Sequence, residues 1–260
     1  MTRTSASFNV VKQPRLADAI VDELERMLIE GVFVPGEKLP SERELAAQFN
    51  VSRPSLREAI QKLEAKGLLI RKQGGGTFVS ESSWESVAEP LFQLMAHHPE
   101  SQFDLLEFRH ALEGICAYYA AVRGTETDDE QLAQCIDSIG QVELSEATLT
   151  EHANAVMAFH LKMAEASHNV VVLQVMLCLK PLLQQNIEEN LTQMMLREDA
   201  QRHVAEHRRH LLAMIVERKP ELARQASHEH LAYIEEAMLD VSRETTRVER
   251  SLRRVRSSNK

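Results

Sequence analysis

Cysteines, aromatic residues and long apolar runs are all scarce in this chain of 260 residues. The three cysteines, Cys116, Cys135 and Cys178, are odd in number, widely spaced and free of any CxxC pair. This pattern excludes a disulfide framework and a thiolate zinc cluster, and it favours a reducing cytoplasm. No run of 18 apolar residues occurs, and the N-terminus has no apolar signal core, so we expect neither secretion nor a membrane partner.

Glycine and proline are also few, with 9 and 8 residues, while 43% of the chain is hydrophobic and 27% is charged. This composition excludes wholesale disorder and low-complexity architecture. Leu, Ala, Glu and Met are plentiful, and all four favour helices. The composition therefore predicts a mainly α protein of one large domain or two modest ones.

The net charge of -9 is unevenly distributed along the chain. Residues 1–80 hold 12 basic against 10 acidic side chains, whereas residues 81–260 hold 18 against 29. Within that acidic remainder, residues 243–260 hold 7 basic against 2 acidic side chains. The overall acidity therefore does not exclude binding to nucleic acid through the N-terminal part.

The first 80 residues have the pattern of a winged helix-turn-helix. Residues 14–31 have apolar positions four apart, and a short helix follows with Ser41 and Glu44 at the spacing of a capping box. After a tight break, Ser52 can cap a second helix, and LLIRKQGGGTFVS then predicts a β-hairpin wing. We expect a winged DNA-binding domain over 1–80, a linker and the start of a bundle over 81–100, an all-α effector-binding and dimerisation domain over 101–242, and a basic tail over 243–260.

The candidate DNA contacts gather at the start of the second helix and in the wing. Arg53 and Arg57 are four apart and can each grip the O6 and N7 atoms of guanine, while Arg43 can approach the phosphate backbone or a flanking base. Serines can donate to phosphates, and the glycine-rich tip lets the wing approach the minor groove. The alternative is that these arginines are ordinary solvated helix charges. The candidates are Arg43, Ser52, Arg53, Ser55, Arg57, Gln73 and Gly74.

The stretch PGEKLPSERELAAQFNVSRPSLREAIQKLEAKGLLIRKQGGGTFV resembles the GntR family of bacterial transcription regulators. By that resemblance Arg43, Arg53, Arg57 and Gly74 fall on positions that contact operator DNA. DLLEFRHALEG resembles the opening of the effector domain in the FadR-type branch of the family. Because a short inverted repeat in DNA mirrors a two-fold protein, we expect a homodimer on operator DNA.

The C-terminal part carries candidates for an effector site. From residue 101 onward the chain reads as helix, and Pro181 is expected to kink or break one of the helices. A pocket for a small carboxylate needs a fixed cation inside an apolar bundle, and Arg109 is the first candidate. Its alternative role is a structural ion pair with Glu113, four residues later. Asn169 matches a family position, although an asparagine at a helix end is more often a C-cap.

His160, His207 and His230 lie on three separate expected helices. Relatives in this branch bind a divalent metal through one Asp and three His, but Val156 stands at the position of the Asp. An ungapped alignment also places Arg208, rather than His207, near the position of the second histidine ligand. Three imidazoles and water can still bind zinc or nickel. The alternative is that these histidines bind the effector, or each other, without any required cofactor.

The leading hypothesis is a transcriptional repressor that a small carboxylate effector releases from DNA. Further stretches resemble regulators of pyruvate dehydrogenase genes, such as RPSLREAIQKLEAKGLL and HPESQFDLLEFRHALEGI, which implies pyruvate as effector and central-metabolism genes as targets. The alternative effector is lactate, glycolate or another small acid. A helical metal-dependent enzyme is less favoured, since the chain has no nucleophile elbow, phosphate-binding glycine loop or HExxH spacing. A third possibility is an architectural DNA-binding protein without an effector.

Overall fold

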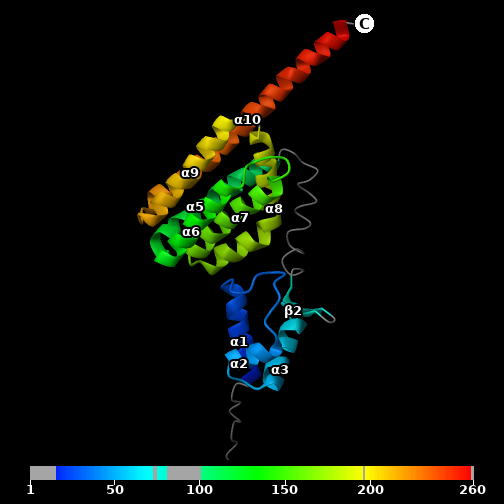
Figure 1. Ribbon diagram of the computed structural model, residues 1–260, viewed down its shortest axis with the longest axis vertical. Coiled ribbons are helices and arrows are strands. Elements are labelled where there is room, and N and C mark those ends of the chain that lie inside the picture. Colours follow the sequence, from blue (N-terminus) through cyan, green and yellow to red (C-terminus); the bar gives the residue numbers. More distant parts are fainter. Residues whose placement is uncertain (1–15, 73–74, 81–100, 196, 259–260) are drawn as a thin grey trace, which may run out of the picture. The chain divides into compact units, whose positions relative to one another are not determined.

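The computed structural model describes residues 16–72, 75–80, 101–195 and 197–258, and it divides into two compact units, residues 1–83 and 84–260 (Figure 1). The expected linker over 81–100 and the wing residues Gln73 and Gly74 lie outside the described residues. Among the described residues the architecture is mainly α, with one two-stranded sheet, which confirms the predicted fold class.

The N-terminal unit contains three helices and a wing. They are α1 (Leu16–Ile29), α2 (Glu42–Gln48), α3 (Arg53–Ala65), β1 (Leu69–Lys72) and β2 (Gly76–Val79). The two strands pair antiparallel, with Leu69 opposite Val79 and Lys72 opposite Gly76. Leu24, Leu45 and Leu56 belong to a core to which all three helices contribute. The unit is therefore a winged helix-turn-helix built around its own apolar centre.

Capping hydrogen bonds determine where α2 and α3 begin. Ser41 and Glu44 form the expected capping box at the start of α2. At the start of α3 the Ser52 hydroxyl accepts a hydrogen bond from the Ser55 amide. Between the two helices Asn50 takes a left-handed conformation with φ of 52°, which asparagine tolerates better than most side chains. These caps fix where the two helices begin, and Arg53 at the first position of α3 is exposed.

The second unit, called here the helical unit, is a six-helix bundle among its described residues. Its elements are α5 (Ser101–Arg123), α6 (Glu126–Gln141), α7 (Leu149–Ala166), α8 (Val170–Met194), α9 (Glu198–Val216) and α10 (Pro220–Ser258). Helix α10 packs along α5 and α9, and α7 packs against α6 and α8 (Figure 1). The sequence predicts helix from residue 101 onward without marking α6 separately, although Thr125 and Asp128 form a capping box at its start.

Two features of the helical unit bear on the kink or break expected at Pro181 and on the basic tail expected over 243–260. Helix α8 runs through Pro181 without a break, because buried Met176, Leu182 and Leu183 on either side pack into the core. Helix α10 continues to Ser258 and so covers most of the expected tail. By length and composition alone α8 is apolar enough to cross a membrane. Its packing against α7 and its nine buried residues are what a core helix of a bundle shows.

Candidate functional site

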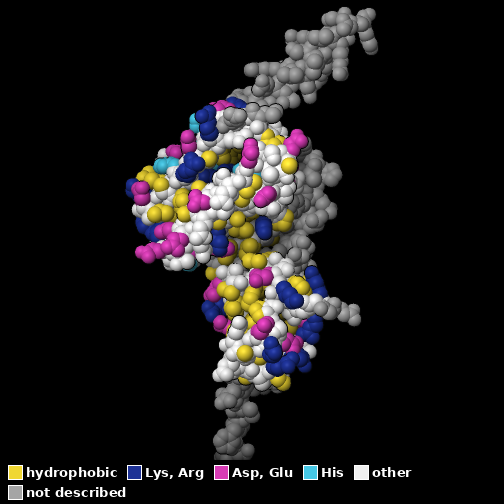
Figure 2. Space-filling view, viewed as in Figure 1, with side chains coloured by type: hydrophobic (Ala, Val, Ile, Leu, Met, Phe, Trp, Pro, Cys, Tyr) yellow, Lys and Arg dark blue, Asp and Glu magenta, His cyan; other side chains and the backbone are white. Residues whose placement is uncertain are grey.

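The exposed arginines of the N-terminal unit lie where the helix-turn-helix geometry predicts DNA contacts. Arg43 is in the first turn of α2, and Arg53 and Arg57 lie one turn apart at the start of α3; all three are exposed. Figure 2 shows Lys and Arg side chains on the face of this unit that is turned to the viewer. Within the described residues Arg43 and Arg53 have no ion-pair partner. Their guanidinium groups are therefore available to bases or phosphates.

Arg57 is held by a carboxylate of the preceding helix. Its Nη2 lies 2.7 Å and its Nε 3.1 Å from Glu42 Oε2. Arg71 on β1 also approaches Glu42, with 3.5 Å between Nη2 and Oε1. The hydrogen bond from Arg57 lowers the pKa of Glu42, so this carboxylate stays ionised. Glu42, which sequence reasoning missed, thus connects α2, α3 and the wing.

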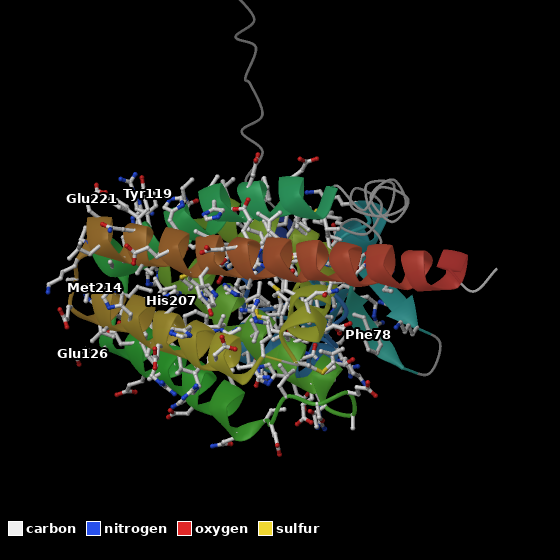
Figure 3. All side chains as sticks on the ribbon, turned by 90° about the horizontal axis from the view of Figure 1, so that it is seen from above. Phe78, Tyr119, Glu126, His207, Met214 and Glu221 are labelled. Atoms are coloured by element: carbon white, nitrogen blue, oxygen red, sulfur yellow. The ribbon has the colours of Figure 1, made fainter. Side chains whose placement is uncertain are left out.

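The serines and the wing present further donors. The Ser52 and Ser55 hydroxyls lie 2.8 Å apart, and each can still reach a phosphate. In the wing, Lys72 Nζ lies 4.6 Å from the centroid of the Phe78 ring, which is labelled in Figure 3. Gly76 has φ of 105°, a conformation that side chains rarely adopt. The described part of the wing is therefore cationic, with a tight backbone turn.

The helical unit contains a second candidate site, a set of polar side chains buried in its core. They come from α5, α7, α8, α9 and α10, helices that are far apart in the sequence. We call this set the buried polar cluster, and its members are Arg109, Glu113, His160, Asn186, Asn190, Arg208 and His230.

One half of the cluster is paired around Arg109 and Glu113, although His160 approaches Glu113 without hydrogen-bond geometry and its Nε2 has no partner among the described residues. Arg109 Nε donates to Glu113 Oε1 at 2.6 Å, and Arg109 Nη1 donates to Asn186 Oδ1 at 2.9 Å. His160 Nδ1 lies 3.1 Å from Glu113 Oε2. Asn190 Nδ2 also donates to Asn186 Oδ1, which leaves Asn190 Oδ1 without a partner. The alternative role expected for Arg109, an ion pair with Glu113, is therefore observed, and Arg109 also lines a cavity.

The other half of the cluster has an unpaired charge. Arg208 is 6% exposed, and its Nε has no hydrogen-bond partner among the described residues. Burial, and then the positive charge of Arg109, lower the pKa of Arg208 from 12.5 to about 10, so it remains charged at neutral pH. Arg109 and Arg208 thus carry two positive charges against the single negative charge of Glu113. Buried charges are normally paired, so Arg208 indicates a site for an anion.

His230 adds neutral hydrogen-bonding groups beside this charge. It is fully buried, and neither ring nitrogen has a partner within the described structure. Burial, and then Arg208, lower the pKa of His230 well below its ordinary value, so the ring is neutral. A neutral imidazole offers one donor and one acceptor to a ligand.

Two spaces adjoin the cluster. An inner cavity of about 20 Å³ is lined by Arg109, Val156, His160, Arg208 and His230, among others; it is large enough for about one water. A larger outer pocket of about 240 Å³ lies between α6, α8 and α9 and shares Arg208 with the inner cavity. Among the described residues, Arg208 is therefore the one charged side chain that lines both spaces.

Two of the predicted effector residues lie elsewhere. Asn169 caps the N-terminus of α8, where its Oδ1 accepts a hydrogen bond from Val172, and it lines neither space. His207 is a residue of α9 (Figure 3), and its ring packs against α10, where the ring centroids of His207 and Tyr233 are 5.3 Å apart. Consecutive helical residues point about 100° apart, so Arg208 rather than His207 faces the cavity.

The three histidines do not fit a divalent metal in this arrangement. Centroid distances are 6.5 Å from His160 to His230 and 6.4 Å from His207 to His230. Across the described ranges no three His, Cys, Asp or Glu side chains are placed to hold one ion. The adjacent guanidinium groups of Arg109 and Arg208 also disfavour a cation. A zinc or nickel ion therefore remains a prediction that this geometry does not support.

Comparisons with known proteins match both units. Residues 16–79 match the family described as bacterial regulatory proteins, gntR family, and residues 104–233 match the FCD domain. The putative L-lactate dehydrogenase operon regulatory protein of Escherichia coli (strain K12) is 36% identical over 88% of each chain. The Glc operon transcriptional activator of the same organism is 28% identical, over 88% of this chain and 91% of its own. Among solved structures, Streptococcus agalactiae GntR is similar with a TM-score of 0.54 and 25% identity, over 84% of this chain and 98% of that chain.

Proposed function

We propose that this chain, which belongs to the GntR family of bacterial transcription regulators and carries an FCD domain, is released from its operator when a small carboxylate pairs with Arg208. Membership of this family makes it a transcription regulator and not an enzyme. The observation that carries the proposal is buried Arg208, whose Nε has no hydrogen-bond partner and which has no ion-pair partner among the described residues. A carboxylate supplies the missing negative charge and can accept two parallel hydrogen bonds.

The neighbours of Arg208 favour an acid with a second oxygen beside its carboxylate. Neutral His230 can donate a hydrogen bond to a 2-oxo oxygen, while the unpartnered Asn190 Oδ1 can accept one from a 2-hydroxyl. Pyruvate is the 2-oxo acid that the sequence resemblance implies. L-Lactate and glycolate are the hydroxy acids that the named relatives suggest. Both kinds of acid are candidates, and no step of the proposal uses a metal.

The size of the inner cavity supports a coupling between acid and operator. A space of about 20 Å³ is too small for a three-carbon acid, so binding requires α8, α9 and α10 to shift or the acid to extend into the outer pocket. A ligand moves an equilibrium only if it binds one state more tightly than another. A coupling of about 1–3 kcal/mol, typical of allosteric proteins, gives a useful switch.

On DNA, we propose that two copies bind a short inverted repeat in the cytoplasm, with Arg53 and Arg57 reading bases in the major groove. Arg43, Ser52 and Ser55 contact the backbone in this scheme. The named relatives support regulation of lactate or glycolate genes better than repression of pyruvate dehydrogenase genes, which rests on the sequence resemblance alone.

The test is fluorescence anisotropy on a labelled duplex that the protein has selected from a random pool, at fixed salt because phosphate contacts make affinity salt-dependent. Pyruvate, L-lactate and glycolate are titrated in turn, with ethanol as a neutral control. At least one acid should weaken binding by fivefold or more, which corresponds to a coupling of about 1 kcal/mol. Arg208→Met should bind DNA normally but ignore the acid, and exposed Arg202→Met on the same helix should behave as wild type. An equal response in Arg208→Met would refute the proposed site.

A further inference from the structure

The outer pocket has apolar walls and a charged inner end. Its volume of about 240 Å³ exceeds the roughly 150 Å³ apolar cavity that accepts benzene in another protein. Eight of its lining residues are apolar and come from α6, the segment after it, α8 and α9: Ile136, Ile139, Val142, Leu144, Leu191, Met194, Val204 and Ala205. A space of this size and lining favours an aliphatic ligand.

Arg208 gives this pocket a fixed anchor. Its guanidinium is buried and lacks a partner for Nε, and the outer pocket meets the inner cavity at this side chain. Arg109 is less available to a ligand, since Glu113 and Asn186 already accept hydrogen bonds from its Nε and Nη1. His152, the other buried polar residue in the wall, is bonded through Nδ1 to the carbonyl of Val142 at 2.9 Å.

The rim of the pocket differs from its inner end. Arg209 and Glu143 line it and are both exposed, with opposite charges. Because the two charges are opposite and open to solvent, they give little net attraction to a second charged group on a ligand. The pocket is therefore suited to a ligand with one carboxylate and an uncharged far end.

We propose that the outer pocket is a subsite for the aliphatic chain of a monocarboxylic acid of about four to eight carbons whose carboxylate pairs with Arg208. The inference rests on the proposed function only in its use of Arg208 as the carboxylate's partner. It extends the ligand class from two- and three-carbon acids to longer aliphatic ones. The longer acid fills the outer pocket and leaves the 20 Å³ inner cavity unexpanded.

The experiment is calorimetric titration of the full-length protein, without DNA, with acetate, butyrate, hexanoate and octanoate at constant ionic strength. Each added methylene that enters the pocket should tighten binding about three- to fourfold. The gain should end near the length that fills the pocket. Methyl hexanoate, which has the chain but no charge, should not bind measurably. Arg208→Met should abolish binding of every acid in the series.

Two variants test the position of the chain. Ala205→Leu fills the pocket from α9 and should remove the gain with chain length, so that hexanoate binds no more tightly than acetate. Gly140→Leu enters from α6, where a Cβ has no heavy atom within 4 Å. Gly140→Leu replaces Ala205→Leu in the experiment if that variant fails to fold, and Gly140→Ala is its matched control.

The outcomes separate this inference from the proposed function. Flat or falling affinity with chain length, together with binding of pyruvate or lactate, would overturn the subsite and leave the effector site standing. Chain-length dependence that survives both filling variants would place the chain elsewhere and also overturn the subsite. Failure of every acid, short or long, to bind the folded protein would overturn both proposals.

Discussion

Replacing Arg208 by methionine should stabilise the unliganded protein while removing its response to acids. Methionine keeps most of the length of the side chain but carries no charge. Arg208 is 6% exposed and has no ion-pair partner among the described residues, so folding transfers a poorly compensated charge into the core. The substitution therefore removes a cost from the folded state, unlike most core substitutions.

The magnitude follows from the pKa of Arg208. Its fall from 12.5 to about 10 corresponds to roughly 3 kcal/mol, at ~1.36 kcal/mol for each tenfold change in proton dissociation. Imperfect packing of methionine offsets part of this, so we expect the free energy of unfolding to rise by about 1–3 kcal/mol. The melting temperature should then rise by about 2–4 °C for each kcal/mol in a protein of this size.

The pH dependence gives this prediction a second signature. Below pH 10 Arg208 is charged in both the folded and the unfolded state, so its cost is constant and the difference between variant and wild type should be flat from pH 6 to 9. Only as the pH rises through about 10 does the folded side chain lose its proton and the cost begin to disappear.

The assay is thermal unfolding of both proteins with and without saturating effector acid. Wild type should gain about 2.7 kcal/mol at an acid concentration one hundred times the Kd, and Arg208→Met should gain nothing. A variant that melts well below wild type would show that Arg208 stabilises the unliganded fold. A variant that still responds to the acid would show that Arg208 does not bind it.

Three further substitutions test other parts of the molecule. Arg53→Ala should weaken operator binding by about 1–3 kcal/mol and relax base preference, as measured by anisotropy on a panel of single-base operator variants; unchanged specificity would contradict the placement of α3 in the major groove. Glu113→Gln leaves Arg109 without its carboxylate, so chemical denaturation should show a loss of about 3–5 kcal/mol. Burial raises the pKa of Glu113, but Arg109 and His160 more than reverse this and bring it below 4.5. The stability that wild type gains from Glu113 is therefore present above pH 4.5 and is lost as the pH falls further, while Glu113→Gln should lack this dependence. Ser41→Ala removes one half of the capping box on α2 and should cost about 1 kcal/mol of stability, with the thermal midpoint as readout; an unchanged midpoint would show that the cap contributes nothing.

Local signals in the sequence were sufficient for much of the fold. The capping box of Ser41 and Glu44 and the glycine-rich hairpin each depend on residues a few positions apart, so the pattern reveals them directly. Thr125 and Asp128 carried the same kind of signal for α6, and it was overlooked. Of the kink or break expected at Pro181, the break does not occur, because tertiary packing on both sides outweighs one missing backbone hydrogen bond.

The buried polar cluster could be foreseen only in part. Arg109, His160 and His230 were named from motif positions, and the structure buries all three. The contact from Arg109 to Asn186 spans 77 positions in the sequence, so it depends on how two helices pack and not on any periodicity. Whether His207 or Arg208 faces inward depends on the rotation of α9, and the ungapped register was the signal that pointed to Arg208.

The ion pairs of Glu42 affect how strongly the DNA affinity of the regulator depends on ionic strength. An arginine that already has a carboxylate partner attracts fewer mobile anions than a free one, and it exchanges one partner for another when it meets a phosphate. Each phosphate neutralised by a free cation contributes about -0.9 to the slope of log affinity against log salt. Arg57 and Arg71, which share Glu42, should contribute less than that each. Operator occupancy should consequently vary less with salt concentration than the number of cationic side chains on this surface suggests.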